Sequence, residues 1–236
     1  MTSSSIQVLS IKRMVLAAVA TLTIVAGMSA AATNSASAAT MECGVYCISV
    51  FSSELGTYEH PNFVEAVLDG GGANVGQPVG LKRANRFDSS EDIQPVQGFV
   101  SDFYKLGVVS AEANSHYGSR TAVQQKYAPY NITVQPELCV GLERVAYQTE
   151  GLTLQPCNAA STVWIIDAFP WTPEGYFPIV NATTTDFDRP FAMHLPRNEV
   201  ASGRPLQMQA RRLQFHGADK TLPARQLWGA WSGTLK

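Results

Sequence analysis

The sequence is poor in charge and has no run of basic residues. Of its 236 residues, 15% are charged, with 17 Lys and Arg against 19 Asp and Glu. Nucleic acids and anionic membranes select basic patches, which a mildly acidic chain does not offer. The pair Arg211-Arg212 stands alone and is typical of a solvated face. We therefore expect no nucleic-acid partner, and no membrane partner for the mature protein.

Catalytic and metal-binding motifs are also missing. The chain has no Gly-x-Ser-x-Gly elbow, no His-Glu-x-x-His pair and no phosphate-binding loop. None of its four histidines has a neighbour at metal-ligand spacing; they are His60, His116, His194 and His216. The sequence thus predicts a protein that is not an enzyme and holds no metal or cofactor. A secreted enzyme of an unrecognised type ranks last among the alternatives.

Long apolar runs are absent beyond one near the N-terminus, at Met14–Met28. A short basic stretch precedes this run, and an Ala-Ser-Ala site at residues 36–38 follows it. This order is typical of a secretory signal peptide, and a spanning helix needs about 20 apolar residues. We predict a signal peptide over 1–39 and a secreted, extracellular domain over 40–236. The Ala-rich signal is bacterial in style, and an uncleaved anchor is the alternative.

Cysteines are few and even in number. The four are Cys43, Cys47, Cys139 and Cys157, all beyond the predicted signal peptide. An even count in an exported chain implies disulfides, and four cysteines allow three pairings. We expect the local one, Cys43 with Cys47 and Cys139 with Cys157, because the second pair would staple a hairpin. Oxidised cysteines leave no thiol nucleophile.

One pattern occurs three times in the chain. A short apolar run is followed, 12 or 13 residues after its first residue, by a glycine that opens a second run, and an aromatic residue comes later. The runs begin at Phe63 and Gly76, at Cys139 and Gly151, and at Phe191 and Gly203; the aromatics are Phe99, Trp164 and Trp228. Internal repetition at such a period is the sequence signature of a repeat architecture.

Three strand–turn–strand units predict an all-β fold, a β-trefoil with repeats at about 43–105, 106–168 and 169–236. One unit cannot bury its own apolar face, whereas three close a barrel without free edges. The expected core residues are Phe63, Phe99, Trp164, Phe191 and Trp228. An Ala/Glu/Gln-rich segment, 110–126, predicts an inserted short helix before the core strands of repeat two. Residues 85–95 predict a polar surface loop.

The second unit resembles one repeat of a ricin-B-type trefoil lectin. The similarity lies in Cys139-Val-Gly-Leu, the run ending at Pro156-Cys157, and Trp164. Gln226-Leu-Trp228 is similar to the family's Gln-x-Trp motif, and Gln97-Gly-Phe99 is a weaker form. In this family a repeat can hold a shallow sugar site. That site uses an Asp two residues after the Cys, an aromatic near the end of the second strand, and a polar residue at the Gln.

The resemblance implies degenerate sugar sites. The Asp position falls on Glu65, Gly141 and Met193, and the aromatic position on Lys82, Gln155 and Gln209. No repeat keeps both a carboxylate and a ring, the two features that sugar binding at a shallow site needs. Repeat one, with Glu65 and Gln97, keeps the most of the family's sugar-binding pattern. The candidate ligand-binding residues are Glu65, Lys82, Gln97, Gln207 and Gln226.

Two functions stay open. The first is an exported, lectin-like trefoil that binds a polysaccharide or another glycan. The second is a trefoil that binds another exported protein, such as a protease inhibitor similar to the Kunitz-type plant inhibitors. Its inhibitory loop would be residues 85–95 or the insertion at 110–130.

Overall fold

A computed structural model describes residues 47–85, 87–130, 133–168, 172–196, 206–217 and 221–232. The predicted signal peptide and Cys43 lie outside the described residues. In the described ranges, no helix is both long and apolar enough to span a bilayer. No three His, Cys, Asp or Glu side chains in these ranges gather into a group that could hold a metal ion.

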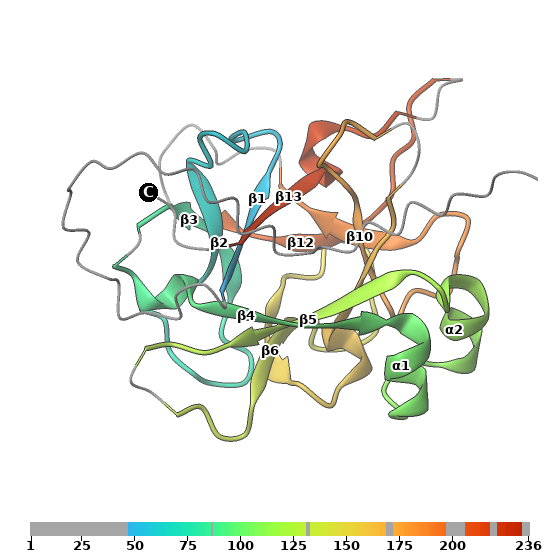
Figure 1. Ribbon diagram of the computed structural model, residues 1–236, viewed down its shortest axis with the longest axis horizontal. Coiled ribbons are helices and arrows are strands. Elements are labelled where there is room, and N and C mark those ends of the chain that lie inside the picture. Colours follow the sequence, from blue (N-terminus) through green and yellow to red (C-terminus); the bar gives the residue numbers. More distant parts are fainter. Residues whose placement is uncertain are drawn as a thin grey trace, which may run out of the picture. The chain divides into compact units, whose positions relative to one another are not determined.

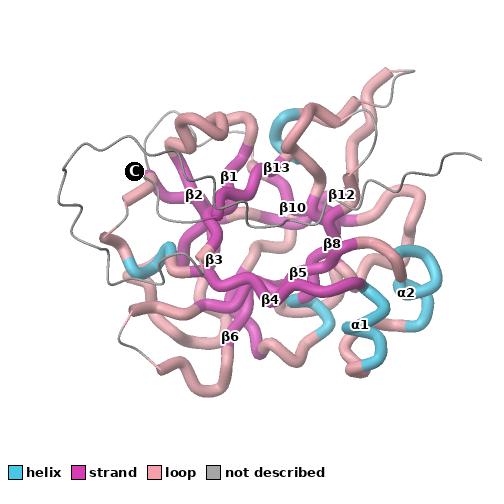
Figure 2. The backbone as a smooth tube through the Cα atoms, viewed as in Figure 1, coloured by secondary structure: helices cyan, strands magenta, loops and turns pink. Residues whose placement is uncertain are grey.

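The described chain is mostly β, with two short helices (Figures 1 and 2). Helices α1 (Val100–Lys105) and α2 (Ala111–Tyr117) follow the fourth strand. The strands are β1 (Ile48–Ser52), β2 (Phe63–Val67), β3 (Val79–Arg83), β4 (Ile93–Phe99), β5 (Thr121–Tyr127), β6 (Leu138–Gly141), β7 (Thr153–Pro156), β8 (Val163–Ile166), β9 (Ile179–Asn181), β10 (Phe191–His194), β11 (Leu206–Gln207), β12 (Gln209–Arg212) and β13 (Trp228–Ser232). Short 3-10 turns precede β4, β8 and β13; they are η2 (Ser89–Glu91), η3 (Ala160–Thr162) and η5 (Ala224–Gln226).

Six strands close a barrel. Antiparallel pairing runs in the order β13, β1, β4, β5, β8 and β9. A bridge between Phe177, just before β9, and Trp228 in β13 closes the ring. These two residues exchange both backbone hydrogen bonds, at 3.0 and 2.9 Å. Closure leaves the barrel without a free strand edge, which is how small antiparallel folds avoid edge-to-edge association.

Three hairpins, β2–β3, β6–β7 and β10–β12, complete the fold. A ring of three backbone hydrogen bonds joins them. Val79 N donates to Leu152 O at 2.8 Å, Leu152 N to Met208 O at 2.8 Å, and Met208 N to Val79 O at 3.1 Å. The ring makes these three residues equivalent and sets the register of the repeats. The chain is therefore a β-trefoil, as the sequence predicts, with β1–β4, β5–β8 and β9–β13 as its three units.

This register corrects the aromatic anchor of repeat one. Ile93, Trp164 and Trp228 each lie two residues after a 3-10 turn, and all three are fully buried. Phe99, predicted to be the anchor, is 52% exposed at the end of β4, so that prediction is wrong. The reason is that β4 runs for seven residues and continues past the anchor, which places Gln97-Gly-Phe99 beyond it.

The smaller anchor of repeat one has a larger cross-strand neighbour. Trp164 pairs with Asn181 and Trp228 pairs with Ser52, whereas Ile93 pairs with Tyr127. The buried Tyr127 hydroxyl donates to Gly71 O at 2.7 Å. A large ring beside a small anchor keeps the summed core volume similar, as close packing of protein interiors requires. Repeat one therefore departs from the Trp pattern without leaving the fold.

The predicted insertion is helical at α2, and α1 adds a second helix that the sequence alone did not predict. The Ser110 side chain caps α2 by accepting from Ala113 N at 3.1 Å. Figure 1 shows α1 and α2 side by side at one end of β4 and β5. Apolar residues of this helical segment form a second core with strand residues outside the main core. This core contains Val100, Phe103, Val109, Ala113, Tyr117, Ala122, Val163, Ile165, Val180, Ala182, Ala192 and Leu213. The insertion is thus an integral part of the domain.

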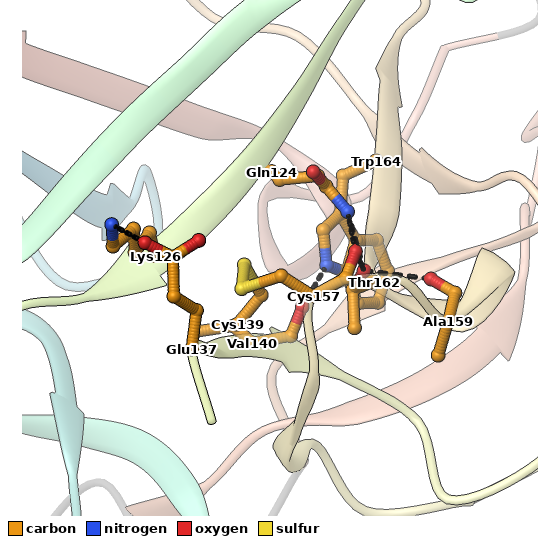
Figure 3. The surroundings of a disulfide bond; sticks show 9 residues. All are labelled: Gln124, Lys126, Glu137, Cys139, Val140, Cys157, Ala159, Thr162 and Trp164. Carbon is orange, nitrogen blue, oxygen red and sulfur yellow. Dashed lines mark hydrogen bonds and ion pairs between the residues drawn. A yellow bond between two sulfur atoms is a disulfide. The ribbon is translucent and has the colours of Figure 1, made fainter. Parts of the chain in front are cut away.

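A disulfide joins Cys139 in β6 to Cys157, just after β7 (Figure 3). The predicted pairing of these two cysteines is confirmed. Cys47 is also disulfide-bonded, but its predicted partner lies outside the described residues. Figure 3 shows the bridge beside Trp164, whose indole N–H donates to Val140 O at 2.8 Å. The bridge therefore ties the two strands of the second hairpin next to the anchor of the same repeat.

Breaking this bridge should lower stability substantially. The loop that it closes spans a sequence separation of 18. Closure of a loop of this size restricts the unfolded chain by about 3 kcal/mol, so Cys139→Ser with Cys157→Ser should lose about that free energy of unfolding. Urea titrations of the oxidised wild type and the double variant measure the difference. Identical midpoints and slopes would show that the bridge adds no stability.

Candidate functional site

The three-fold register decides which residues occupy the sugar-site positions of the resembled family. Glu65, Val140 and Met193 are equivalent, because their hairpin partners are the equivalent residues Leu81, Leu154 and Ala210. The Asp position of repeat two, Gly141, therefore matches Ala66 and His194. The sequence pattern instead places the Asp position of repeats one and three on Glu65 and Met193, one residue before Ala66 and His194. The pattern aligns Cys139 with Phe63, whereas the structure aligns Cys139 with Val64.

Glu65 cannot contact a ligand from this position. Glu65 is 1% exposed, and among the described residues neither of its carboxyl oxygens has a hydrogen-bond partner. The equivalent Val140 and Met193 belong to the main hydrophobic core. Burial raises the pKa of Glu65 to about 8, which makes it a neutral carboxylic acid at pH 7. The prediction that Glu65 binds sugar is therefore wrong.

Repeats two and three have no open sugar site at the family position. A Cβ at Gly141 would lie 2.8 Å from Thr162 Cγ2 and 2.9 Å from Ser161 O, so no acidic side chain fits there. In repeat three, His194 is 2% exposed, and its Nε2 lies 3.4 Å from Arg211 Nη1. These two positions therefore serve packing and internal polar contacts.

The predicted glutamines also have structural contacts. Gln226 is fully buried; its Oε1 accepts from Gln214 N at 2.8 Å and its Nε2 donates to Arg212 O at 2.9 Å. The Gln207 amide donates to Leu152 O at 3.1 Å and so links two hairpins. Gln97 is exposed in the β4–β5 ladder, four residues past the anchor Ile93. None of the three joins a shared site.

Polar side chains do converge in repeat one, around η2. We call Lys82, Asn85, Phe87, Asp88, Ser90 and Glu91 the repeat-one site. The Lys82 ammonium pairs with Asp88 and donates to Ser90 Oγ at 2.9 Å. Asp88 Oδ1 also accepts from Ser90 N at 3.0 Å and so caps the 3-10 turn. Of the predicted ligand-binding residues, only Lys82 lies in this site.

The other end of the loop is held by Glu91. Both of its carboxylate oxygens accept from Asn85 N, at 3.0 and 3.1 Å. This contact is the counterpart of the bond from Gln214 N to Gln226, because Asn85 and Glu91 are equivalent to Gln214 and Gln226. Phe87 lies between the two braces, and its side chain is 63% exposed. The loop thus presents an aromatic ring next to fixed polar groups.

The two carboxyl groups of the site differ in protonation. Burial, with a smaller contribution from the neighbouring Asp88, raises the pKa of Glu91 to about 8 against the opposing Asn85 hydrogen bond. Burial also acts on Asp88, but hydrogen bonds from Lys82 and Ser90 hold the pKa of that carboxyl below its ordinary value. At neutral pH the site therefore offers one charged acceptor and one neutral carboxylic acid.

The sequence analysis named residues 85–95 as a polar surface loop and a candidate inhibitory loop, but it did not name Phe87, Asp88 and Glu91 as ligand-binding residues. That interpretation holds only in part, since Ile93 in this range is buried in the core and begins β4. A usable signal was present. Aligning Ile93 with Trp228 places Glu91 at the glutamine of Gln226-Leu-Trp228 and locates the site.

Comparison with known proteins gives similarities to solved structures. No protein-family model and no curated protein matches the chain. The designed three-fold symmetric protein ThreeFoil is similar with a TM-score of 0.47 and 8% identity, over 78% of this chain and 96% of that chain. The SDF2-like protein from Arabidopsis thaliana is similar with a TM-score of 0.39 and 12% identity, over 80% and 93%. The trefoil assignment rests on the strand topology described above.

Proposed function

We propose that the protein is an exported carbohydrate-binding trefoil that holds its ligand at the repeat-one site. The observation that carries the proposal is the aromatic residue Phe87, which is 63% exposed, on a loop braced by Lys82–Asp88 and Asn85–Glu91. The oxidised Cys139–Cys157 pair supports an exported setting, because disulfides persist in oxidising compartments.

The chemistry of the site suits a sugar. A pyranose has an apolar C–H face that stacks on an aromatic ring, and hydroxyls that accept and donate hydrogen bonds. Phe87 provides the ring, and the ionised Asp88 provides a charged acceptor, which makes stronger hydrogen bonds than a neutral one. The braces hold the loop before binding, so little conformational entropy is lost when the ligand is immobilised.

The test is a binding screen of residues 40–236, with disulfides formed, against soluble and insoluble polysaccharides. Phe87→Ala should weaken binding about tenfold, because one aromatic contact contributes roughly 0.5–1.5 kcal/mol beyond its buried area. Asp88→Asn should weaken binding as well, by removing the charge. Phe99→Ala is the matched control, since Phe99 is another exposed ring outside the site. Equal affinities for the wild type and both site variants would exclude this site.

A protein ligand is the second candidate, and the same loop favours it. An exposed Phe87 on a segment held at both ends has the form of a rigid inhibitory loop. In that case the protein would inhibit a protease that prefers aromatic side chains, and Phe87→Ala would relieve the inhibition. A protease panel with wild type and Phe87→Ala separates this function from glycan binding.

A further inference from the structure

Three aromatic rings form a cluster where α2 meets the loop between β9 and β10: His116 and Tyr117 belong to α2, and Phe187 belongs to the loop. His116 and Phe187 stack with ring centroids 4.7 Å apart and planes at 18°. Tyr117 meets His116 edge-on at 4.5 Å and Phe187 at 5.8 Å. His116 is exposed, whereas Tyr117 is 4% exposed and belongs to the second core. The cluster therefore has a buried base and an accessible aromatic surface.

The loop that carries Phe187 is fixed in place. Asp186 Oδ1 accepts from Arg189 N at 3.1 Å, and Asp186 Oδ2 accepts from Arg212 Nη1 at 2.6 Å. Arg212 also donates to Arg189 O at 2.8 Å. On the other side, Tyr117 anchors α2 in the second core. Both segments that form the aromatic cluster, α2 and the loop with Phe187, are therefore held in place before binding, which lowers the entropic cost of binding a ligand.

Polar groups with unused hydrogen-bonding capacity border the aromatic cluster. Asp167 is 4% exposed, and its side chain forms an ion pair with Arg120, whose Nε lies 3.5 Å from Asp167 Oδ1. Burial raises the pKa of Asp167, while the charges of Arg120 and His116 lower it. Burial and the Asp167 charge raise the pKa of Tyr117, which keeps its hydroxyl a donor. Neither the Tyr117 hydroxyl nor the Asp167 carboxylate has a hydrogen bond to a described residue.

We propose that His116, Tyr117, Phe187, Asp167 and Arg120 form a second ligand site, which binds the ring of a neutral sugar. The apolar face of the sugar stacks on the exposed ring of His116, which the partly buried Phe187 supports from its other face. The sugar hydroxyls bond to the exposed guanidinium of Arg120, which pairs with the buried Asp167. The charges of Asp167 and Arg120 balance, so a neutral, hydroxylated ligand fits better than an ion. This site stands independently of the repeat-one site, although both would bind carbohydrate.

The test monitors the imidazole proton resonances of His116 by NMR while neutral oligosaccharides are added. The probes are cello-, malto-, manno- and chito-oligosaccharides at up to about 10 mM, which detects millimolar affinity. We expect at least one probe to shift the His116 signals, in the wild type and equally in Phe87→Ala. Affinity, measured for the variants by isothermal titration calorimetry with the probe that shifts the wild-type signals, should fall about tenfold in His116→Ala and in Arg120→Gln, as expected for loss of one stacking or charged contact.

Glu112→Gln, an exposed change on the same helix, is the matched control and should leave the affinity unchanged. Asp167 is buried, so the exposed His116 and Arg120 carry the test rather than a variant that risks misfolding. The proposal is overturned if no probe shifts the His116 resonances, or if His116→Ala and Arg120→Gln bind as the wild type does. Binding that Phe87→Ala alone abolishes would support the repeat-one site and overturn this second one.

Discussion

Glu65→Met should raise the free energy of unfolding of this protein. The wild-type side chain is buried, and both of its oxygens lack a hydrogen-bond partner in the part of the chain that the structure describes, at a position where the other repeats place Val140 and Met193. An unpaired polar group in a hydrophobic core costs about 1–3 kcal/mol in mutational data, and methionine removes that cost while filling a similar volume. Urea titrations at pH 7 measure the gain.

The pH dependence of the gain follows from the pKa of Glu65. In the folded protein this pKa is raised from 4.5 to about 8. As pH rises, the unfolded state therefore releases its proton first. The stability that Glu65 contributes to the wild type as a neutral acid is fully present below pH 4.5 and is lost progressively as pH rises from there through 8. The gain from Glu65→Met therefore grows over the same range. A difference of one between the folded and unfolded pKa values corresponds to about 1.4 kcal/mol, so the loss should be of the order of a few kcal/mol.

Glu65→Gln serves as the isosteric comparison, because it cannot ionise but keeps a polar group in the core. Glu91 has a pKa raised in the same direction, so the difference between wild type and Glu65→Gln isolates the contribution of Glu65. Glu112→Gln, an exposed change, should leave the wild-type profile intact. Parallel profiles for wild type and Glu65→Gln from about pH 5 to about pH 9 would contradict the argument, since the folded and unfolded states bind different numbers of protons over most of that range.

Glu65 is not the one departure from apolar packing in this barrel. Gln125 occupies the place of Val50 and Ile179 on the equivalent strands. It is fully buried, and neither atom of its amide has a hydrogen-bond partner within the described ranges. The equivalence follows from the anchor pairs Ile93–Ile48, Trp164–Val123 and Trp228–Phe177, each two residues earlier on the strand. Glu65 and Gln125 thus stand at positions where the other repeats place apolar residues of the main core, Val140 and Met193 for the first and Val50 and Ile179 for the second.

The sequence was sufficient to predict the β-trefoil fold, because the three copies of the pattern can be recognised even where individual residues differ between repeats. It did not suffice for the register of repeat one. In repeat one the pair Ile93–Tyr127 stands where the other repeats pair a Trp with a smaller residue. The two members of this pair lie on different strands, β4 and β5, so the compensation between them cannot be seen in a local stretch of sequence. Helix α1 was missed for a related reason. Its six residues gain stability by burying Val100 and Phe103 in the second core, a tertiary contact that local propensity does not report.

The candidate site was hidden by the same kind of error. Asp88 and Glu91 looked like solvated charges, and their roles depend on hydrogen bonds to Lys82, Ser90 and Asn85. Glu65 was predicted at the sugar-binding Asp position because the sequence alignment of the repeats was off by one residue, and a register change of one residue moves a strand side chain to the opposite face. The residue types were readable from the sequence, but the faces they occupy were not.

Trp228→Ala should be among the most destabilising single changes in the domain. Trp228 is fully buried, closes the barrel against Phe177, and donates its indole N–H to Met193 O at 2.9 Å. Truncating a buried tryptophan costs about 3–5 kcal/mol, from lost burial and the cavity that remains. Trp228→Phe keeps most of the ring but leaves the carbonyl unpartnered, and it should cost about 1–3 kcal/mol. Urea unfolding with intact disulfides measures both.

Phe99→Ala and Ile93→Ala complete the comparison, because they decide which residue is the anchor of repeat one. Phe99 is 52% exposed, so its truncation should change stability by roughly 0.5 kcal/mol or less. Ile93 is fully buried beside Tyr127, and its truncation should cost about 2–5 kcal/mol. A large loss in Phe99→Ala with a small one in Ile93→Ala would restore Gln97-Gly-Phe99 as the motif. The opposite order, which we expect, places repeat one in the register that brings Glu91 and Phe87 together at the candidate site.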